Sequence, residues 1–307
     1  MTTAANAGNG YKHALNTIQW FASGDGTLDR TKGPSREEIF MAIREAGFPA
    51  TVARIAPAER PNETVEEFKQ LLDETGLLPA PGYYNVPSPV SGVTVADAVD
   101  GARKSAANQA QLGLTEMFIA SGISKTDRDR FEKPAIGAFF DQGRLDDVTN
   151  RIGRCAEAMR AEGIHAALHP HVGTWIETEA EARHVLDSID PKTLGFGPDT
   201  GHLSWAGADV GALFTDYRDR VLAMHLKDIR LDIRDELIAE GKTYGESALR
   251  GLWAEPGLGQ VDMSKYIAML GPDFNGWIVV EVDRPTMDPF ESAKVSAAWM
   301  RNLKRPD

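Results

Sequence analysis

The sequence predicts a protein of the α/β class, a single-domain (β/α)8 TIM barrel, on three observations. Eight short apolar runs alternate with longer segments of helical periodicity, which is typical of repeated βα units around a parallel sheet. The 307 residues are a usual length for such a barrel. A doubly wound sheet is disfavoured, because no G-x-G-x-x-G motif follows the first apolar run.

Each strand is predicted from a short run rich in apolar residues between turn signals. In chain order the eight runs cover residues 13–20, 50–56, 77–86, 116–121, 164–169, 194–199, 221–227 and 277–283. We expect one barrel domain over residues 1–307, in which residues 1–11 form a flexible N-terminal tail.

The helices are predicted from their periodicity and their end signals. The first covers residues 35–47, where Ser35 and Glu38 form an S-x-x-E capping box and Gly47 ends the helix. The arrangement repeats at residues 64–76, 95–113, 145–163, 178–189 and 288–303. Two connections, 122–143 and 229–259, exceed the usual loop length, and we expect them to lie over the catalytic face, where βα loops emerge.

Composition restricts the partners and the compartment. The net charge of −12 disfavours binding to nucleic acid or to an anionic membrane surface. Cys155 is the only cysteine, so no intrachain disulfide forms, and we expect a buried, inert thiol. No apolar run approaches the ~18 residues that span a bilayer, and the first residues lack the apolar region of a signal peptide. We therefore expect a soluble, cytoplasmic protein.

Polar residues follow the predicted strands five to eight where each strand ends. They lie in the segments HPHVGTWIE (169–177), PDTGH (198–202), MHLKD (224–228) and VVEVD (279–283). The carboxyl ends of barrel strands converge on one face, which makes these segments a candidate active site. Carboxylates and imidazoles are ligands for divalent metals, so the pattern indicates a metal enzyme.

Asp199 and His225 are the first two candidate ligands. An Asp at a strand end also caps the next helix in many proteins, but His202, three residues further on, favours a site. Alternate residues of a barrel strand face inward, so His225 and Lys227 are expected to share the lumen face. A structural, buried histidine remains the alternative for His225.

Glu281 interrupts an apolar strand, where an unpaired carboxylate is costly. Metal ligation explains it better than a structural ion pair with Arg284. His169 and His171 lie two residues apart and are candidate ligands, an acid/base pair, or one of each. Glu177 is a further candidate ligand, or an acidic residue favoured at the start of a helix.

Taken together, the segments HPHVGTWIE, PDTGHLSWAGAD, MHLKDIR, EPGLGQVDM and GWIVVEVDRP resemble the sugar phosphate isomerase/epimerase superfamily of xylose isomerase-like barrels. Within it, the chain is most similar to the inosose dehydratases and to their relatives, the metal-dependent C-glycoside deglycosidases that act on 3-oxo-glycosides. The resemblance is strongest over residues 164–285. It is specific for the superfamily and weak for the substrate.

The resemblance implies a metal set of Glu, Asp, His and Glu that holds Mn²⁺, or alternatively Co²⁺ or Mg²⁺. Asp199, His225 and Glu281 match three of these positions. The first Glu has no clear match, because the family's E-N-H-P-G-T segment reads HPHVGT here, with His169 in its place. Either His169 binds the metal or Glu177 supplies the fourth ligand. Glu177 is preferred, because it restores three carboxylates for a hard ion.

The activity that the resemblance implies is that of a divalent-metal-dependent lyase acting on an oxo-sugar or oxo-glycoside. It proceeds by α-proton abstraction, enediolate stabilisation and β-elimination of water or an aglycone. His169 or His171 is the expected base. Four residues are expected to contact the substrate: His202, Lys227, Arg230 and Trp20. The alternatives are a ketose isomerase or epimerase and a non-catalytic sugar-binding or structural subunit. The resemblance also suggests a smaller partner subunit or a homo-oligomer.

Overall fold

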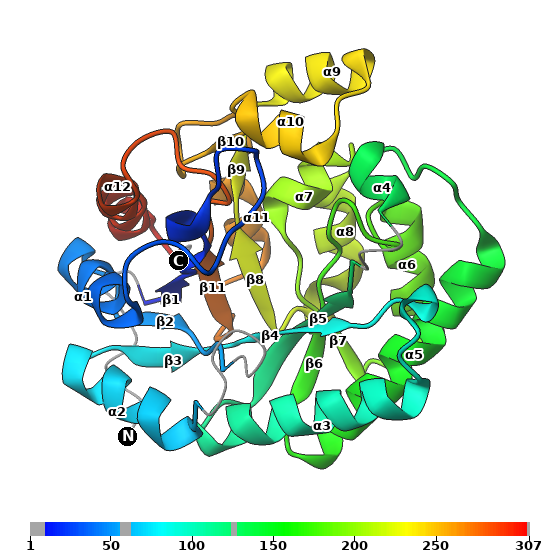
Figure 1. Cartoon of the computed structure of the whole chain (residues 1–307), viewed down its shortest axis with the longest axis horizontal. Coiled ribbons are helices and arrows are strands. Elements are labelled where there is room, and N and C mark those ends of the chain that lie inside the picture. The colour runs from blue at the N-terminus through cyan, green and yellow to red at the C-terminus, as the bar shows by residue number, and fades with distance from the viewer. Residues whose placement is uncertain (1–9, 56–62, 124–127, 306–307) are drawn as a thin grey trace.

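The computed structural model describes residues 10–55, 63–123 and 128–305. Strands form a ring at the centre of the molecule and helices cover its outside (Figure 1). All eight predicted strands are present in the predicted order, and the (β/α)8 barrel is confirmed. Residues 1–9 of the expected tail and residue 56 of the second predicted strand lie outside the described residues, whereas Tyr11 is buried.

The barrel strands pair in parallel within two sheets, in the orders β3-β2-β1-β11-β8 and β4-β5-β6-β7. Their bounds are β1 (Lys12–Leu15), β2 (Ala50–Val52), β3 (Leu78–Ala80), β4 (Tyr83–Val86), β5 (Glu116–Ser121), β6 (His165–Leu168), β7 (Leu194–Phe196), β8 (Ala223–Leu226) and β11 (Trp277–Val280). Parallel bridges from Phe196 to Val221 and from Asp199 to His225 join β7 to β8. On their other side the two sheets meet between β3 and β4, into which the structure divides the third predicted strand.

Pro81 and Gly82 cause that division. Proline has no N–H to donate to a sheet. The side chain of Gln109 replaces the missing bonds: its Oε1 accepts from the Gly82 N–H at 3.0 Å, and its Nε2 donates to the Ala53 carbonyl at 2.9 Å. A Cβ on Gly82 would lie 2.3 Å from the Ala53 oxygen, so only glycine fits this approach. The ring therefore continues through the interruption.

The predicted helices begin and end within a few residues of their expected bounds. They are α1 (Arg36–Ala46), α2 (Val65–Thr75), α3 (Val95–Gln111), α5 (Gln142–Ala161), α6 (Glu179–Ser188) and α12 (Pro289–Asn302). The predicted capping box is present: Ser35 Oγ accepts the Glu38 N–H at 3.2 Å and the Glu38 carboxylate accepts the Ser35 N–H at 2.7 Å. The structure adds α7 (Thr200–Trp205), α8 (Val210–Tyr217), α11 (Met263–Met269) and the 3-10 helices η1 (Ile18–Phe21), η2 (Pro89–Ser91) and η3 (Arg218–Arg220).

The two long connections contain secondary structure of their own. The first includes α4 (Asp129–Glu132). The second leaves the carboxyl end of β8 as β9 (Asp228–Ile229), continues through α9 (Leu231–Glu240) and α10 (Tyr244–Leu249), and returns as β10 (Trp253–Ala254), antiparallel to β9. The Asp228 carboxylate accepts N–H groups of Gly257, Gly259 and Val261 at 2.9–3.0 Å, which fastens the base of this segment. In Figure 1 α9 and α10 lie beside α7 and α4.

The barrel lumen has its own small core, separate from the larger core between strands and helices. Strands β1, β2, β3, β5, β6, β8 and β11 contribute to it, and its members are Ala14, Ala50, Val52, Ala80, Phe118, Ala167, Ala223, Trp277 and Val279. Most of these side chains are small, and Phe118 and Trp277 are the two large ones. A Cβ on Gly197 would lie 2.7 Å from the Phe118 ring, so glycine is required opposite it.

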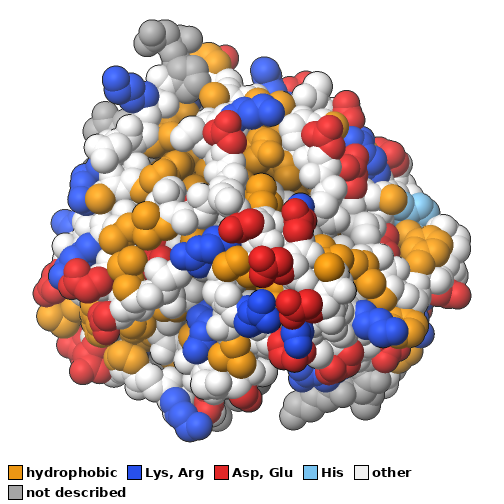
Figure 2. Space-filling view, turned by 90° about the horizontal axis from the view of Figure 1, so that it is seen from above, with side chains coloured by type: hydrophobic (Ala, Val, Ile, Leu, Met, Phe, Trp, Pro, Cys, Tyr) orange, Lys and Arg blue, Asp and Glu red, His pale blue; other side chains and the backbone are white. Residues whose placement is uncertain are grey.

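The surface carries both signs of charge. On the face shown in Figure 2, Lys and Arg side chains are interspersed with Asp and Glu and do not form one extended basic area. No helix in the described part of the chain is both long and apolar enough to cross a membrane.

Candidate metal centre

The alternation of side chains along a strand determines which polar groups enter the lumen. Residues two apart on a strand face the same side of the sheet. Three polar residues lie two positions after a residue of the lumen core: His169 after Ala167, His225 after Ala223, and Glu281 after Val279. The same spacing leads from Gly197 to Asp199. These four polar side chains therefore lie directly above the lumen core.

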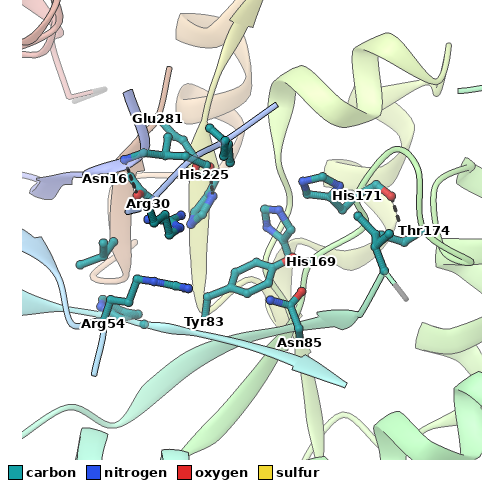
Figure 3. A pocket seen from close by; sticks show the side chains of 16 residues that line it. Asn16, Arg30, Arg54, Tyr83, Asn85, His169, His171, Thr174, His225 and Glu281 are labelled. Atoms are coloured by element: carbon teal, nitrogen blue, oxygen red, sulfur yellow. Dashed lines mark hydrogen bonds and ion pairs between the residues drawn. The ribbon is translucent and has the colours of Figure 1, made fainter. Parts of the chain in front are cut away.

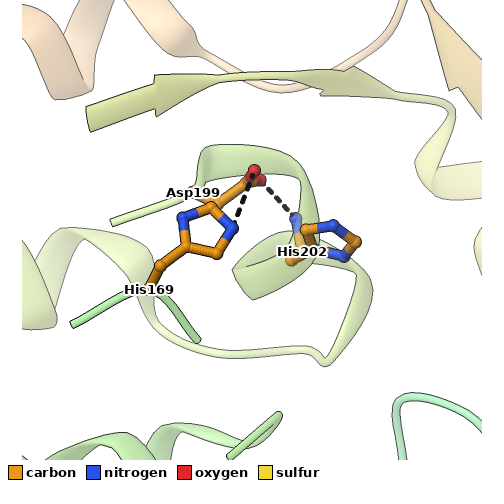
Figure 4. Close-up of side chains that lie close together, drawn as sticks. All are labelled: His169, Asp199 and His202. Carbon is orange, nitrogen blue, oxygen red and sulfur yellow. Dashed lines mark hydrogen bonds and ion pairs between the residues drawn. The ribbon is translucent and has the colours of Figure 1, made fainter. Parts of the chain in front are cut away.

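Asp199, His225 and Glu281 meet at this level, and each is buried. Each offers one potential ligand atom within 4.8 Å of the other two. His225 Nδ1 lies 2.7 Å from Glu281 Oε2 and 3.8 Å from Asp199 Oδ2. His169 adds a fourth group, because its Nε2 lies 3.8 Å from the same Asp199 oxygen (Figure 4). The structure thus places Asp199, His225 and Glu281 together, and with them His169, which the sequence analysis gave as the alternative to Glu177 for the fourth ligand.

The chemistry of this cluster fits a divalent cation. Asp199 Oδ2, His225 Nε2 and His169 Nδ1 are buried and have no hydrogen-bond partner among the described residues. Buried polar atoms without partners are costly and are uncommon in folded proteins. Two carboxylates and two imidazoles are a donor set for manganese, zinc and related ions. The ring nitrogens that lie within 4 Å of these carboxylates are His225 Nδ1 and His169 Nε2, so a cation in the cluster would lie among these two atoms and Asp199 Oδ2. The unpartnered nitrogens are the other ones of each ring.

Asp199 performs two tasks. Its Oδ1 accepts the backbone N–H of His202 at 2.8 Å and so caps α7, while Oδ2 points into the cluster. The capping interpretation of this residue is therefore confirmed, and its role as a metal ligand stays a prediction. Burial raises the pKa of Asp199, and the nearby charges of Lys227 and His225 act in the opposite direction.

Lys227 is fully buried beside the cluster. Its Nζ lies 2.9 Å from Asp283 Oδ1, 3.1 Å from Glu281 Oε2 and 3.5 Å from Asp199 Oδ2. Burial alone would lower its pKa, but these three carboxylates raise it. A Cβ on Gly201 would lie 2.8 Å from the Lys227 Cγ, so glycine at that position admits the lysine stem. Asp283 is the nearest anchor of the ammonium group.

A second pair of imidazoles lies next to the ammonium group. The rings of His171 and His202 are 3.7 Å apart between centroids, and His202 Nε2 lies 3.1 Å from Lys227 Nζ. His171 Nδ1 lies 2.7 Å from the Val172 carbonyl, which assigns the proton to Nδ1 and leaves Nε2 as an acceptor. Burial and the charge of Lys227 lower the pKa of His171 to about 3, so this ring is neutral at neutral pH.

Glu177 is not among the groups that the structure brings together at the cluster. Its Oε2 accepts backbone N–H groups of Gly173 at 2.8 Å and Ala135 at 3.2 Å, and its Oε1 accepts that of Gly137 at 2.9 Å. Burial raises its pKa, and these N–H groups oppose the rise. Both oxygens are thus used in joining the loop after α4 to the turn after β6. The sequence preference for Glu177 over His169 did not anticipate this local role.

Two expected substrate contacts are also directed elsewhere. Arg230 Nη1 donates to the carbonyls of Gly251 and Trp253 at 2.7 and 3.2 Å, which ties β9 to the returning chain. Trp20 is buried and packs edge-on against Phe290 at 5.9 Å between ring centroids. Neither residue lines the cavity above the cluster. Arg284, the alternative partner of Glu281, instead donates to the Ser23 carbonyl at 2.6 Å.

The cavity has a volume of about 240 Å³ and opens above the donor cluster (Figure 3). Its wall includes His169, His171, His225 and Glu281, and also residues that the sequence reading did not select: Asn16, Arg30, Arg54, Tyr83 and Asn85. Three of these five residues could have been predicted from the alternation of side chains along a strand. Asn16, Arg54 and Asn85 lie two residues after Ala14, Val52 and Tyr83 on the lumen face.

Comparison with known proteins agrees with this geometry. Residues 40–303 match the family described as "Xylose isomerase-like TIM barrel". An inosose dehydratase of Lactiplantibacillus plantarum is 32% identical over 166 residues, covering 53% of this chain and 55% of that protein. The chain thus spans about half the length of this curated relative.

Two solved structures share the fold. A probable 3-DHS dehydratase from Bacillus anthracis superposes with a TM-score of 0.67 at 18% identity, over 94% of this chain and 98% of that one. A xylose isomerase-like TIM barrel protein from Mycobacterium smegmatis, in complex with magnesium, gives 0.67 at 16% identity, over 94% and 95%. The family match covers most of the chain, and the strand order and strand-end chemistry are consistent with it. The chain therefore belongs to the xylose isomerase-like TIM barrel family.

Proposed function

We propose that the protein is a divalent-metal-dependent lyase that eliminates a group from an oxo-sugar, as a dehydratase does. One observation carries the proposal: buried ligand atoms of Asp199, His225 and Glu281 lie within 4.8 Å of one another, and His225 and Glu281 also line a cavity whose wall includes a neutral imidazole, His171. The name of the inosose dehydratase relative supports this reaction class over isomerisation.

Four residues would hold the metal: Asp199, His225, Glu281 and His169. His169 is favoured over Glu177, because Glu177 has both oxygens engaged by backbone N–H groups. A bound divalent ion would supply Lewis acidity towards a substrate carbonyl. Mn²⁺ is our first choice, with Co²⁺, Mg²⁺ and Zn²⁺ as alternatives that fit the same donors.

His171 is the proposed base. Its Nε2 accepts the proton from the carbon next to the carbonyl, and its Nδ1 proton stays with the Val172 carbonyl, which fixes the ring. The electron pair left on carbon forms the new double bond as the bond to the leaving group breaks. Lys227 and His202, whose Nζ and Nε2 lie 3.1 Å apart, are the proposed proton donors for the leaving group, although neither lines the cavity. The leaving group departs as water or as a neutral aglycone.

The test separates metal binding, proton removal and elimination. Protein loaded in turn with Mn²⁺, Mg²⁺, Co²⁺ or Zn²⁺ is incubated with an inosose, an O-linked and a C-linked 3-oxo-glycoside, and free ketoses. Deuterium uptake from D₂O reports proton removal, and mass spectrometry reports elimination. We expect elimination from an oxo-sugar only when metal is present.

The variant His171→Asn is expected to lower kcat by about 10²- to 10⁴-fold, the usual contribution of a general base, with metal content unchanged. Turnover of ketoses alone would support the isomerase or epimerase reading and sink the lyase proposal. Sugar binding without metal and without deuterium uptake would support a non-catalytic subunit.

A further inference from the structure

Tyr244 brings an aromatic ring from the second long connection to the edge of the site. It is the first residue of α10, and its side chain is buried. The ring stacks on Phe131 of α4, with 4.4 Å between the centroids and 13° between the planes. Trp205 of α7 packs against the same ring at 4.9 Å between centroids. The side chain thus joins the connection 229–259 to two other segments beside the site.

Local sequence fixes the position at which Tyr244 begins its helix. Thr243 Oγ1 accepts the Glu246 N–H at 3.3 Å, and the Glu246 carboxylate accepts the Thr243 N–H at 3.0 Å. This capping box sets the first turn of α10. A Cβ on Gly26 would lie 2.1 Å from the Gly245 carbonyl oxygen, so the chain after η1 packs closely on the same turn. The backbone from which the Tyr244 side chain extends is therefore held from two sides.

The hydroxyl group of Tyr244 reaches the carboxylate that holds Lys227. Tyr244 Oη donates to Asp283 Oδ2 at 3.2 Å, while Asp283 Oδ1 accepts Lys227 Nζ at 2.9 Å. The two oxygens of one buried carboxylate therefore join Tyr244 to the ammonium group. The last torsion of an aspartate side chain is soft, so hydrogen bonds at both oxygens restrict its rotation. The Tyr244 hydroxyl group thus helps to direct Oδ1 towards Lys227.

The ring of Tyr244 lies behind the turn that carries His171. The two rings are almost parallel, with 6° between their planes and 6.2 Å between their centroids. Gly173 lies in the same turn, and a Cβ there would lie 2.6 Å from the Phe131 ring and 3.5 Å from Tyr244 Cδ2. Its φ of 87° also favours glycine. Phe131 and Tyr244 therefore form the aromatic surface against which this turn packs.

We infer that Tyr244 is a positioning residue for both proton transfers of the proposed reaction. Its hydroxyl group holds Asp283, and thereby the ammonium group of Lys227, a proposed proton donor to the leaving group. Its ring supports the turn that carries His171, the proposed base. Tyr244 does not line the cavity, so it acts through these residues and not on the substrate. The inference rests on the proposed function for the roles of Lys227 and His171.

Two variants separate the hydroxyl group from the ring: Tyr244→Phe keeps the ring, and Tyr244→Leu removes both. Each metal-loaded variant is incubated in D₂O with an oxo-sugar that the wild type converts. Deuterium in the recovered substrate reports proton removal, and product reports elimination. For Tyr244→Phe we expect elimination to slow by about tenfold, the order of one hydrogen bond to a charged group, with deuterium uptake at the wild-type rate. For Tyr244→Leu we expect both rates to fall by at least about tenfold, because the base is displaced.

The matched control is Tyr217→Phe. It removes a hydrogen bond of 2.8 Å from a tyrosine hydroxyl group to the Asp187 carboxylate, between α8 and α6, and should leave both rates unchanged. Thermal melts of each variant establish that it is folded. An equal loss of elimination and of deuterium uptake in Tyr244→Phe would overturn the inference, because a general loss of structure has that effect. Wild-type rates in both Tyr244 variants would overturn it as well.

A second measurement needs no turnover. In Mg²⁺-loaded protein labelled with ¹⁵N-histidine, the His171 Nδ1 proton, bonded to the Val172 carbonyl, gives an NMR signal that His171→Asn identifies by its loss. We expect this signal in the wild type and in Tyr244→Phe, and its loss through exchange with water in Tyr244→Leu. An unchanged signal in Tyr244→Leu would overturn the support of His171 by the ring. Absence of turnover with every oxo-sugar, together with loss of the signal in Tyr244→Leu, would refute the proposed function and leave that support standing.

Discussion

Glu177→Gln and His169→Gln are expected to have opposite effects on fold and metal. Glu177 accepts three backbone N–H groups and is not part of the donor cluster. His169 lies 3.8 Å from Asp199 Oδ2 and has an unpartnered ring nitrogen. We therefore predict that Glu177→Gln loses stability and keeps metal, whereas His169→Gln loses metal.

The expected loss of unfolding free energy in Glu177→Gln follows from the hydrogen bonds that Glu177 makes. The amide oxygen of Gln can replace Oε2 and serve Gly173 and Ala135, but its NH₂ group then faces the Gly137 N–H, which loses its acceptor. An unsatisfied donor costs ~1–3 kcal/mol when it is buried, and the Gly137 N–H is partly buried. The two remaining bonds also weaken, because they no longer end on a charged oxygen. We take ~2 kcal/mol as the expected loss of unfolding free energy.

This loss corresponds to a measurable shift in Tm. At ~2.1 cal/mol/K per residue, a chain of 307 residues has an unfolding entropy of ~0.64 kcal/mol/K, so ~2 kcal/mol lowers Tm by ~3 °C. For His169→Gln we expect metal affinity to fall by at least ~10- to 100-fold, the range seen when even outer partners of a metal ligand are changed.

Calorimetric melts of metal-free protein and metal titrations of each variant provide the two readouts. The matched control is Glu157→Gln, an exposed site on α5, which should change stability by less than ~0.5 kcal/mol. Loss of metal binding in Glu177→Gln with normal binding in His169→Gln would refute the assignment. An unchanged Tm in Glu177→Gln would refute the role of its backbone contacts.

Three further predictions concern the ion pair between Asp283 and Lys227, the glycine that packs against the Lys227 side chain, and the only cysteine. Asp283→Asn removes the nearest anchor of Lys227 and leaves its ammonium to pair with Glu281 and Asp199, so metal affinity should fall; an unchanged metal Kd would contradict this. Gly201→Ala places a Cβ 2.8 Å from the Lys227 stem and should destabilise the protein by ~1–3 kcal/mol in thermal melts, whereas the control Gly211→Ala, with no contact closer than 3.4 Å, should not. Burial raises the pKa of Cys155 to about 11, so at pH 8 only roughly 0.1% of it is thiolate, and DTNB should react with unfolded but not with native protein. Rapid labelling of the native protein at pH 8 would argue against burial of the thiol. Because the pKa of Cys155 is higher in the folded than in the unfolded protein, the stability contributed by the buried thiol is complete below the unfolded pKa and declines as pH rises towards 11.

Much of the fold can be read from local patterns. Apolar runs and capping signals such as Ser35 with Glu38 depend on residues close in sequence, and the structure follows them. The lumen positions of His225 and Glu281 follow from the alternation of side chains along a strand, which is also local. Arg54 obeys the same rule, and could have been selected by extending it to the second strand.

The sequence by itself determined the order of the strands, the faces on which their side chains lie, and the family, because each depends on short-range periodicity and motif order. Only the tertiary structure decided which groups meet across strands and loops. Glu177 and His169 are eight positions apart on one segment, and from the sequence alone both are candidate ligands. Packing directs Glu177 to the backbone N–H groups of Ala135 and Gly137, some forty residues earlier in the chain, and leaves His169 beside Asp199. Such contacts depend on how distant segments close around the barrel, which no local pattern encodes.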